Sequence, residues 1–293
     1  MKRFFLAASA VLFAGPAFAD MTVEIPFTAE IAGTLFKCAD SYPGLGAAGT
    51  EVQILDFRLF VSSATLVAAD GTRVPVALEQ DGAWQIDNIA LLDFEDATGS
   101  CANGTPQVNA TLRGTVPEGD YRGLEFEVGV PFDWNHGDPT TAPAPLNLTA
   151  MFWNWRGGYK FAKIEFAPVT AMGMNTAAET HSEGAGHGGP GGWMLHLGST
   201  MCAAPEATAA PSEPCANPNR VAVSLPDFVP GASTVVIDPA PVVAGADLTR
   251  NTPETSAGCM SFNNDPDCNT VLPRLGLAFN ALPAESQLLV SMR

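Results

Sequence analysis

VQILDFRLFVSSATLV, residues 52–67, indicates the fold class most clearly. One face of it carries Gln53, Leu55, Phe57, Leu59 and Val61. This period of two residues is typical of a β-strand rather than a helix. Asp70-Gly71 follows shortly afterwards, and such a pair between two strand-like segments predicts a tight hairpin.

Short strand-like segments recur along the rest of the chain. An extended apolar start spans residues 21–36, and Gly157-Gly158 predicts a second hairpin. Further strand candidates are 83–92, 108–116, 121–130, 146–155, 159–167, 193–197, 220–225, 234–237 and 287–292. The 28 glycines and 24 prolines favour turns between short strands and exclude a coiled coil or helical bundle. The sequence therefore predicts an all-β, single-domain β-sandwich over residues 20–293, with long loops and a disulfide-stapled C-terminal third.

Residues 1–19 predict a secretory signal peptide. Lys2 and Arg3 precede an apolar run, and Ala17-Phe18-Ala19 forms an A-x-A cleavage site. The run is too short for a membrane anchor, and no later segment reaches the roughly 18 apolar residues that a membrane span requires. We expect a periplasmic or secreted protein that begins near Asp20 and has no membrane span.

The six cysteines suit an oxidising compartment, where an even number indicates disulfides. Short loops close most easily, so we expect the pairs Cys202–Cys215 and Cys259–Cys268, which leaves Cys38 with Cys101. The alternative is a metal site made of thiolates. The chain contains no C-x-x-C pair to favour it.

The chain is strongly acidic, with 14 Lys and Arg against 31 Asp and Glu and a net charge of −17. Nucleic acids and anionic lipids need a basic surface, so both are excluded as partners. Cations are the expected partners.

Four histidines are the strongest metal-ligand candidates. His136 follows an apolar strand that ends at Val130, and His196 lies within the 193–197 strand, where alternation places it on the same face as Met194. A neutral imidazole beside a thioether suits a soft or borderline metal such as copper. The alternative is that each histidine is a hydrogen-bonded structural residue. His181 and His187 lie in a loop rich in Gly, Ala and Ser.

Two other groups of residues suggest competing functions. Trp153 and Trp155 share a face of a predicted strand and would form a carbohydrate-binding or adhesion platform if exposed, or core packing if buried. Asn263, Asn264, Asp265 and Asp267 offer oxygen ligands for calcium, although their spacing is not that of an EF-hand and a solvated loop is the simpler interpretation.

No hydrolase motif is present, neither G-x-S-x-G nor H-E-x-x-H, so we expect a binding protein rather than an enzyme. A copper-dependent redox enzyme would need an open coordination position and a substrate groove. The sequence identifies neither of these features.

A set of short motifs occurs in order through nearly the whole chain. They are Gly33-Thr34-Leu35-Phe36-Lys37-Cys38, Asp56-Phe57-Arg58-Leu59-Phe60-Val61-Ser62, Val130-Pro131-Phe132, Met151-Phe152-Trp153-Asn154-Trp155 before Gly157-Gly158-Tyr159-Lys160-Phe161, His196-Leu197-Gly198-Ser199-Thr200 before Cys202, and Gly258-Cys259-Met260-Ser261 before Asp265-Pro266-Asp267-Cys268. In these motifs the chain resembles the MbnP-type periplasmic copper proteins, the metallo-mystery-pair four-Cys family, to which the methanotroph copper protein MopE is related.

The resemblance implies a copper ion held by two histidines and by a kynurenine made from tryptophan. In the family the modified tryptophan stands two residues before the first histidine, and the second histidine comes much later. Trp134 and His136 match this spacing, and His196 matches the later ligand. We expect Trp134 and His136 to share one side of an extended segment.

The resemblance also implies a partner, a secreted MauG-like di-haem enzyme of the peroxidase type that oxidises the tryptophan. It assigns no role to His181 or His187. The implied function is copper acquisition, storage or handover.

Overall fold

The computed structural model describes residues 19–169 and 192–293. The predicted signal peptide and the loop with His181 and His187 lie outside the described residues. Within them, the strands form two sheets, one of six strands and one of ten, and the all-β sandwich predicted from the sequence is confirmed.

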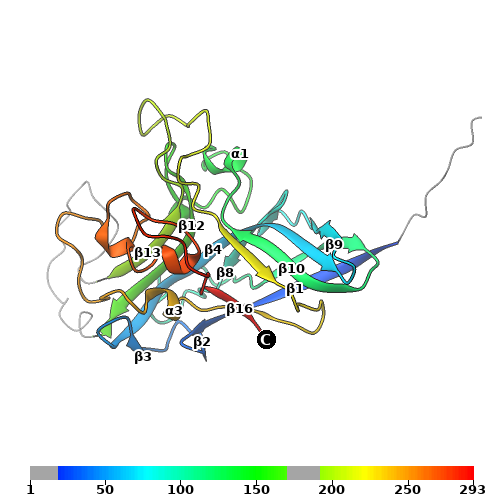
Figure 1. The fold of residues 1–293 in the computed structure, drawn as a ribbon, viewed down its shortest axis with the longest axis horizontal. Helices are drawn as coiled ribbons and strands as arrows, with labels where there is room; N and C mark the ends of the chain where they lie inside the picture. The colour runs from blue at the N-terminus through cyan, green and yellow to red at the C-terminus, as the bar shows by residue number, and fades with distance from the viewer. Residues whose placement is uncertain (1–18, 170–191) are drawn as a thin grey trace, which may run out of the picture.

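The smaller sheet has the order β16-β15-β1-β9-β6, with β2 paired to β1. Its strands are β1 (Asp20–Ile31), β2 (Thr34–Leu35), β6 (Ala77–Leu78), β9 (Thr111–Pro117), β15 (Val235–Ile237) and β16 (Val290–Met292). The C-terminal β16 joins β15, which runs parallel to β1, so the first and the last described strands lie in the same sheet, separated by β15 (Figure 1).

The larger sheet has the order β11-β12-β4-β10-β14, with four more strands paired to this path and β7 paired to one of them, β8. Its strands are β3 (Tyr42–Leu45), β4 (Thr50–Ala68), β5 (Arg73–Pro75), β7 (Gln85–Ile86), β8 (Ile89–Asp93), β10 (Tyr121–Val128), β11 (Phe152–Asn154), β12 (Gly158–Pro168), β13 (Trp193–Gly198) and β14 (Val221–Leu225). The long strand β4 contains the stretch that indicated the fold class. It pairs with β12 through residues 52–59, with β10 through 61–68 and with β8 through 58–62.

The core forms between the inner faces of the sheets. Val23, Ile25 and Phe27 alternate inward from β1, and Phe27 meets Phe126 of β10 edge to face, with 5.8 Å between ring centroids. Such aromatic pairs add packing energy beyond the apolar area that they bury. Both sheets are thereby fixed to one core.

The predicted hairpins are present, and two strand predictions are corrected. Gly71 takes a φ of +86° in the β4–β5 turn, and Gly158 takes +77° at the start of β12. Residues 83–92 are two strands, β7 and β8, that turn at Asp87 with a φ of 52°. Residues 146–155 form the short helix η1 (Thr149–Met151) and then β11, because the backbone turns before it pairs with β12.

Short helices complete the described fold: α1 (Phe132–Asn135), α3 (Ala240–Val243), η2 (Pro266–Cys268) and η3 (Pro273–Leu275). No helix among the described residues is both long and apolar enough to cross a bilayer. Figure 1 shows α1 and the loop after β13 standing together beyond the end of the larger sheet.

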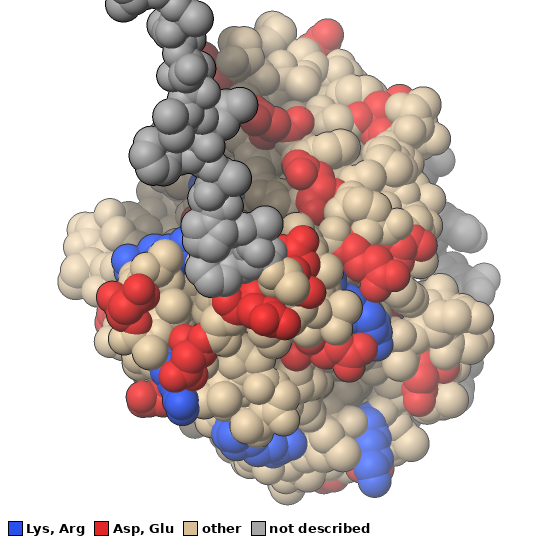
Figure 2. All heavy atoms as spheres, turned by 90° about the vertical axis from the view of Figure 1, so that its right-hand side faces the viewer, with Lys and Arg blue, Asp and Glu red and all other residues tan. Residues whose placement is uncertain are grey.

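All six cysteines form the predicted disulfides, Cys38–Cys101, Cys202–Cys215 and Cys259–Cys268. No cysteine is free, so the alternative of a thiolate metal site is wrong for this state of the chain. The disulfides fit a secreted or periplasmic protein. Figure 2 shows acidic side chains spread over one face of the molecule, as the net charge requires.

Candidate metal centre

His136 lies at the end of α1, directly after strand β10. Residues 132–135 form one helical turn, and His136 is its C-cap. The prediction of an extended backbone at residues 134–136 is therefore wrong. The backbone N–H groups of Trp134 and Asn135 both donate to the carbonyl of Pro131, as in a turn of helix. Positions two apart in a helix do not face each other, so Trp134 and His136 point in different directions.

Hydrogen bonds fix the ring of His136 in one tautomer. Its Nδ1 lies 3.0 Å from the carbonyl oxygen of Trp155, which can only accept, so Nδ1 carries the proton and donates. Nε2 is then the unprotonated nitrogen. It lies 3.1 Å from Nδ2 of Asn135 and 3.6 Å from Sγ of Cys215. Burial lowers the pKa of His136, against the opposing effect of the Trp155 carbonyl, so the ring is neutral at pH 7.

Asn135 ties α1 to the neighbouring strands. Its Oδ1 accepts from the backbone N–H of Tyr159 at 2.8 Å, and its Nδ2 donates to Oγ of Ser199 at 2.8 Å. A cavity of about 130 Å³ opens beside His136, and Phe161, Ser199, Cys215 and Arg220 are among its lining residues. His136 therefore lines a small cavity, and hydrogen bonds with Asn135 hold its neighbours in place.

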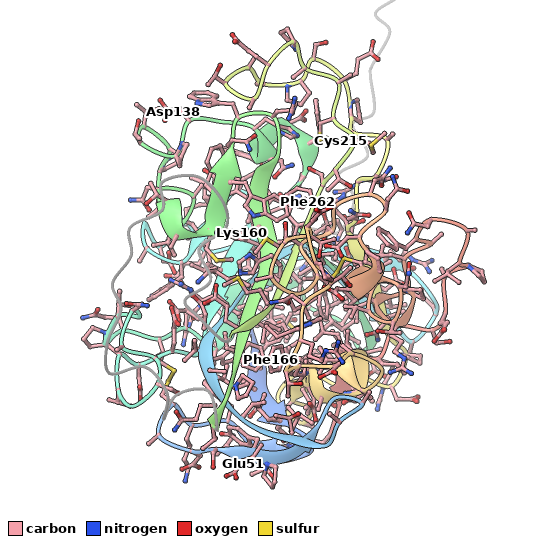
Figure 3. The ribbon with its side chains drawn as sticks, turned by 90° about the vertical axis from the view of Figure 1, so that its left-hand side faces the viewer. Glu51, Asp138, Lys160, Phe166, Cys215 and Phe262 are labelled. Atoms are coloured by element: carbon pink, nitrogen blue, oxygen red, sulfur yellow. A yellow bond between two sulfur atoms is a disulfide. The ribbon has the colours of Figure 1, made fainter. Side chains whose placement is uncertain are left out.

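The Cys202–Cys215 disulfide forms part of the wall of this cavity. Nε2 of His136 and the two sulfur atoms all lie within 4.8 Å of one another. Because the two sulfur atoms form a disulfide, they carry no thiolate charge and are weak metal ligands. His136 is therefore the one strong donor of this group. Figure 3 shows Cys215 and Asp138 at one end of the molecule and Glu51 at the other.

His196 lies in β13, in register with Lys163 of β12. Its Nε2 lies 2.9 Å from Oε1 of Glu165, whereas its Nδ1 is buried with no hydrogen-bond partner among the described residues. Burial alone would raise the pKa of Glu165, but hydrogen bonding from His196 and the charge of Lys163 lower it to about 2. The carboxylate is thus ionised and accepts the Nε2 proton.

His196 is itself a neutral ligand candidate. Burial is the largest effect and lowers the pKa of its imidazole, and the positive charges of Lys160 and Lys163 act in the same direction. The bond to Glu165 opposes them. A histidine that donates one N–H to a carboxylate and presents its other nitrogen bare has the arrangement of a metal ligand with an orienting partner.

A buried group of charges continues from His196 across the larger sheet. The paired positions His196, Lys163, Arg58 and Asp93 form one row across β13, β12, β4 and β8. Arg58 forms ion pairs with Asp56 and, at 2.8 Å, with Glu95. Lys163 pairs with Asp56 and Glu165.

Burial changes the pKa values of several members of this group. It raises the pKa of Asp93 to about 6 and, with the negative charge of Asp56, that of Glu95 to about 8. It lowers the pKa of Lys160 to about 8, together with the charge of Lys163. Strongly shifted groups beside a bare histidine nitrogen make this face a functional-site candidate.

No described contact joins the three predicted ligands, Trp134, His136 and His196. Nε1 of Trp134 donates to Oδ2 of Asp87 at 3.0 Å, and neither Trp134 nor His196 lines the cavity beside His136. Continued alternation beyond β13 places Ser199, a neighbour of the His136 site, on the opposite face from His196. His136 and His196 therefore approach this part of the fold from different sides.

The two tryptophans of the carbohydrate alternative do not form a platform. Trp153 is half-buried, packs on Phe262 with 5.7 Å between ring centroids, and covers Gly198. Trp155 lies in the turn after β11 rather than on the same strand. The two rings are therefore not presented side by side on one exposed strand.

The acidic loop uses most of its oxygens internally. Asp265 Oδ1 accepts from the N–H of Asp267, and Asp267 binds the backbone and hydroxyl of Thr252. Within this loop, Oδ2 of Asp265 is the one buried side-chain oxygen without a hydrogen-bond partner among the described residues. These contacts favour a structural loop over the calcium site that was the second interpretation.

The comparisons with known proteins agree with this structure. The MbnP family model matches residues 20–261. The chain belongs to the MbnP family. MbnP from Methylosinus trichosporium has a similar structure, with a TM-score of 0.77 and 30% sequence identity over 94% of this chain and 98% of that one. A search of curated proteins gives no match.

Sequence reasoning on this MbnP-family chain missed Glu165, the residue that orients His196. The available signal was a pair of charges, Lys163 and Glu165, two residues apart in an otherwise apolar strand. It also missed Asn135, which holds the His136 loop to two strands. A lone asparagine in a loop carries no comparable signal.

Proposed function

We propose that this MbnP-family chain is a secreted copper-binding protein that serves in copper acquisition, storage or handover. One observation carries the proposal. The structure contains two buried, neutral histidines, each with one ring nitrogen fixed as a proton donor and the other unprotonated. Nδ1 of His196 has no hydrogen-bond partner among the described residues, whereas Nε2 of His136 accepts from Nδ2 of Asn135, which a metal would displace. Imidazole nitrogen is a preferred ligand of copper.

The ligands in this proposal are Nε2 of His136 and Nδ1 of His196. The Trp155 carbonyl orients the first ring and Glu165 orients the second. Copper is the ion that the protein would bind and carry. The two imidazoles are neutral at pH 7, so neither ring has to lose a proton before it can bind the metal. Protons compete with the metal only when the pH falls below the lowered pKa values of the two rings.

We further propose Trp134 as the tryptophan that a MauG-like di-haem partner oxidises to kynurenine. An intact indole has no lone pair for a metal, whereas opening its pyrrole ring leaves an aniline nitrogen and carbonyl oxygens. Trp134 is half-buried at the surface, and its N–H is held by Asp87. The ring is therefore within reach of a partner protein before it is modified.

A binding function is favoured over an enzymatic one. Ser199 Oγ donates to the carbonyl of Gly157 at 3.2 Å rather than to a histidine, so it is not an activated nucleophile. Among the described residues, the side chains of His136, His196 and Ser199 are held in place by hydrogen bonds to the backbone and to neighbouring side chains.

Isothermal titration with Cu(I) and with Cu(II) tests the proposal. Wild-type protein should bind copper tightly, and His136→Ala and His196→Ala should each weaken binding, while His181→Ala serves as the control. The stoichiometry decides how the two donors are used. One ion per chain that is lost in either variant indicates a shared site, and two ions indicate separate sites. Full affinity in both single variants would reject the assignment.

A further inference from the structure

One face of β13 lies outside the main hydrophobic core although its side chains are buried. Trp193, Leu195 and Leu197 all belong to the core cluster, as alternation along a strand requires. Met194 and His196 occupy the alternate positions. Met194 is only 3% exposed, yet it is not part of that cluster. The β13 face with Met194 and His196 is therefore the face opposite the core.

A second buried methionine reaches the same face from another segment. Cys259 pairs with Leu195 in a parallel bridge, in which the Cys259 N–H donates to Met194 and the Cys259 carbonyl accepts from His196. Cys259 belongs to the core cluster, whereas the next residue, Met260, is buried at 5% exposure and does not. The alternation therefore places Met260 on the same side as His196.

The neighbouring positions close this face toward one end. Gly198, two residues after His196, lies directly under the ring of Trp153, so close that an added Cβ would stand 2.5 Å from it. Phe262, two residues after Met260, packs on the same ring. Met194, His196 and Met260 are therefore bounded by an aromatic pair at one end and by Glu165 alongside.

We propose that Met194 and Met260 supply thioether ligands beside Nδ1 of His196, which makes this face a Cu(I) site. This inference rests on the proposed function, because it assumes that the bound ion is copper. It adds the ligand set and the oxidation state.

The donor chemistry selects Cu(I). Thioether sulfur is a soft donor that favours Cu(I), whereas Cu(II) favours nitrogen and oxygen in tetragonal geometry. Two thioethers and one neutral imidazole carry no charge, so they suit a singly charged ion in a buried place better than a doubly charged one. The ionised Glu165, bonded to the far side of the imidazole and shared with Lys163, offsets part of the added positive charge.

Leucine replacements test the thioethers without opening a cavity, because Met and Leu have similar volumes. The variants are Met194→Leu, Met260→Leu and the double variant. Met151→Leu is the matched control, since Met151 is fully buried within the core cluster. Cu(I) affinity is measured anaerobically on the mature protein, in competition with bathocuproine disulfonate. The double variant should bind Cu(I) at least about tenfold more weakly, the effect typical of groups close to a metal. Met151→Leu should not differ from the wild type.

X-ray absorption at the copper edge gives a second readout that does not depend on affinity. Wild-type protein loaded with Cu(I) should show sulfur neighbours, and the double variant should lose them. Unchanged Cu(I) affinity in the double variant, or a wild-type spectrum with nitrogen and oxygen neighbours alone, would overturn the proposal. If His196→Ala loses copper while the methionine variants keep it, only the thioether ligands are rejected. A wild-type protein that binds no copper rejects the proposed function as well.

Discussion

Glu165 and His196 are joined across strands β12 and β13 by a hydrogen bond of 2.9 Å that decides which ring nitrogen can meet a metal. Because the carboxylate is ionised, the proton stays on Nε2 and Nδ1 remains bare. Glu165→Leu removes the acceptor and frees the tautomer. We expect copper affinity at His196 to fall about 10- to 100-fold, as for other partners that orient a ligand.

The measurement combines a copper competition titration with long-range proton–nitrogen NMR of the imidazole. Glu165→Gln is the control, because its amide oxygen still accepts from Nε2. It should keep the tautomer and most of the affinity. A tautomer in Glu165→Leu that matches the wild type would show that Glu165 does not orient the ring.

Arg58 forms a buried ion pair with Asp56 and also contacts Glu95, whose raised pKa of about 8 keeps it protonated at neutral pH. Arg58→Met leaves Lys163 as the remaining described cation beside Asp56, and removal of one member of a buried ion pair costs about 3–5 kcal/mol. The free energy of unfolding, measured in urea, should fall by that amount. Arg73→Met is the control, because Arg73 pairs with Glu125 on the surface and exposed pairs contribute about 0–1 kcal/mol. Equal effects of the two substitutions would contradict the buried role of Arg58.

Glu95 makes stability depend on pH in a defined direction. Its pKa in the folded protein is about 8, whereas an unfolded chain has a glutamate pKa of about 4.3. The folded state therefore holds a proton that the unfolded state releases. The contribution of Glu95 to the free energy of unfolding is fully present below the pKa of the unfolded chain. It is lost as the pH rises through the pKa of the folded protein.

Urea midpoints measured between about pH 5 and pH 9 test this dependence. Wild-type stability should decline toward the alkaline end, and Glu95→Gln, which resembles the protonated acid, should decline less. Parallel curves for the two proteins would assign the dependence to other groups.

The sequence predicted the strands well where one face is apolar and the pairing is local. The β4–β5 hairpin follows from Asp70-Gly71, and β1 follows from the extended apolar start, although the chain turns at Gly33 and returns as β2 instead of running on to residue 36. The period of β4 did not reveal that Asp56 and Arg58 are buried, because their partners Lys163 and Glu165 lie about a hundred residues away in β12. A pattern within one strand carries no information about the charged residues of a distant strand that pairs beside it in the sheet.

The sequence predicted which residues belong to the candidate site better than it predicted how they are arranged in space. His136 and His196 are both buried, and Met194 is buried outside the core cluster that contains Trp193, Leu195 and Leu197, as the alternation of the strand predicts. The relation of Trp134 to His136 was wrong, because a single helical turn replaces the extended segment. Four residues after a proline offer too few periodic positions to distinguish a turn of helix from a strand.

The Cys202–Cys215 disulfide should protect the ring of His136 from water. The two cysteines are 13 residues apart, and closing a loop of that length stabilises the folded state by about 3 kcal/mol. Replacing both cysteines with alanine should lower the free energy of unfolding by a similar amount. It should also raise the pKa of His136 toward its ordinary value of about 6.5, because burial is what lowers it.

NMR titration of the histidine signals measures this pKa change. Replacement of Cys259 and Cys268 is the control, since that disulfide does not touch His136. It should lower stability but leave the His136 titration unchanged. If both replacements raise the pKa of His136 equally, the change comes from a general loss of stability. It is then not due to the loss of the Cys202–Cys215 disulfide beside the ring.

Trp134 is the predicted target of the di-haem partner, and mass spectrometry can place the modification on one residue. Conversion of tryptophan to kynurenine inserts two oxygens and then loses the formyl carbon with one of them, a net gain of about 4 Da. Protein co-expressed with the partner should carry this shift on the peptide that contains Trp134. Trp134→Phe should abolish it, and Asp87→Asn should leave the target in place because the amide oxygen can still accept from the indole. Trp153 is the informative comparison, since its ring covers Gly198 near His196 and packs on Phe262. A shift that maps to Trp153 and survives in Trp134→Phe would move the modified residue to the His196 face and reject Trp134, while the copper-binding proposal would still stand.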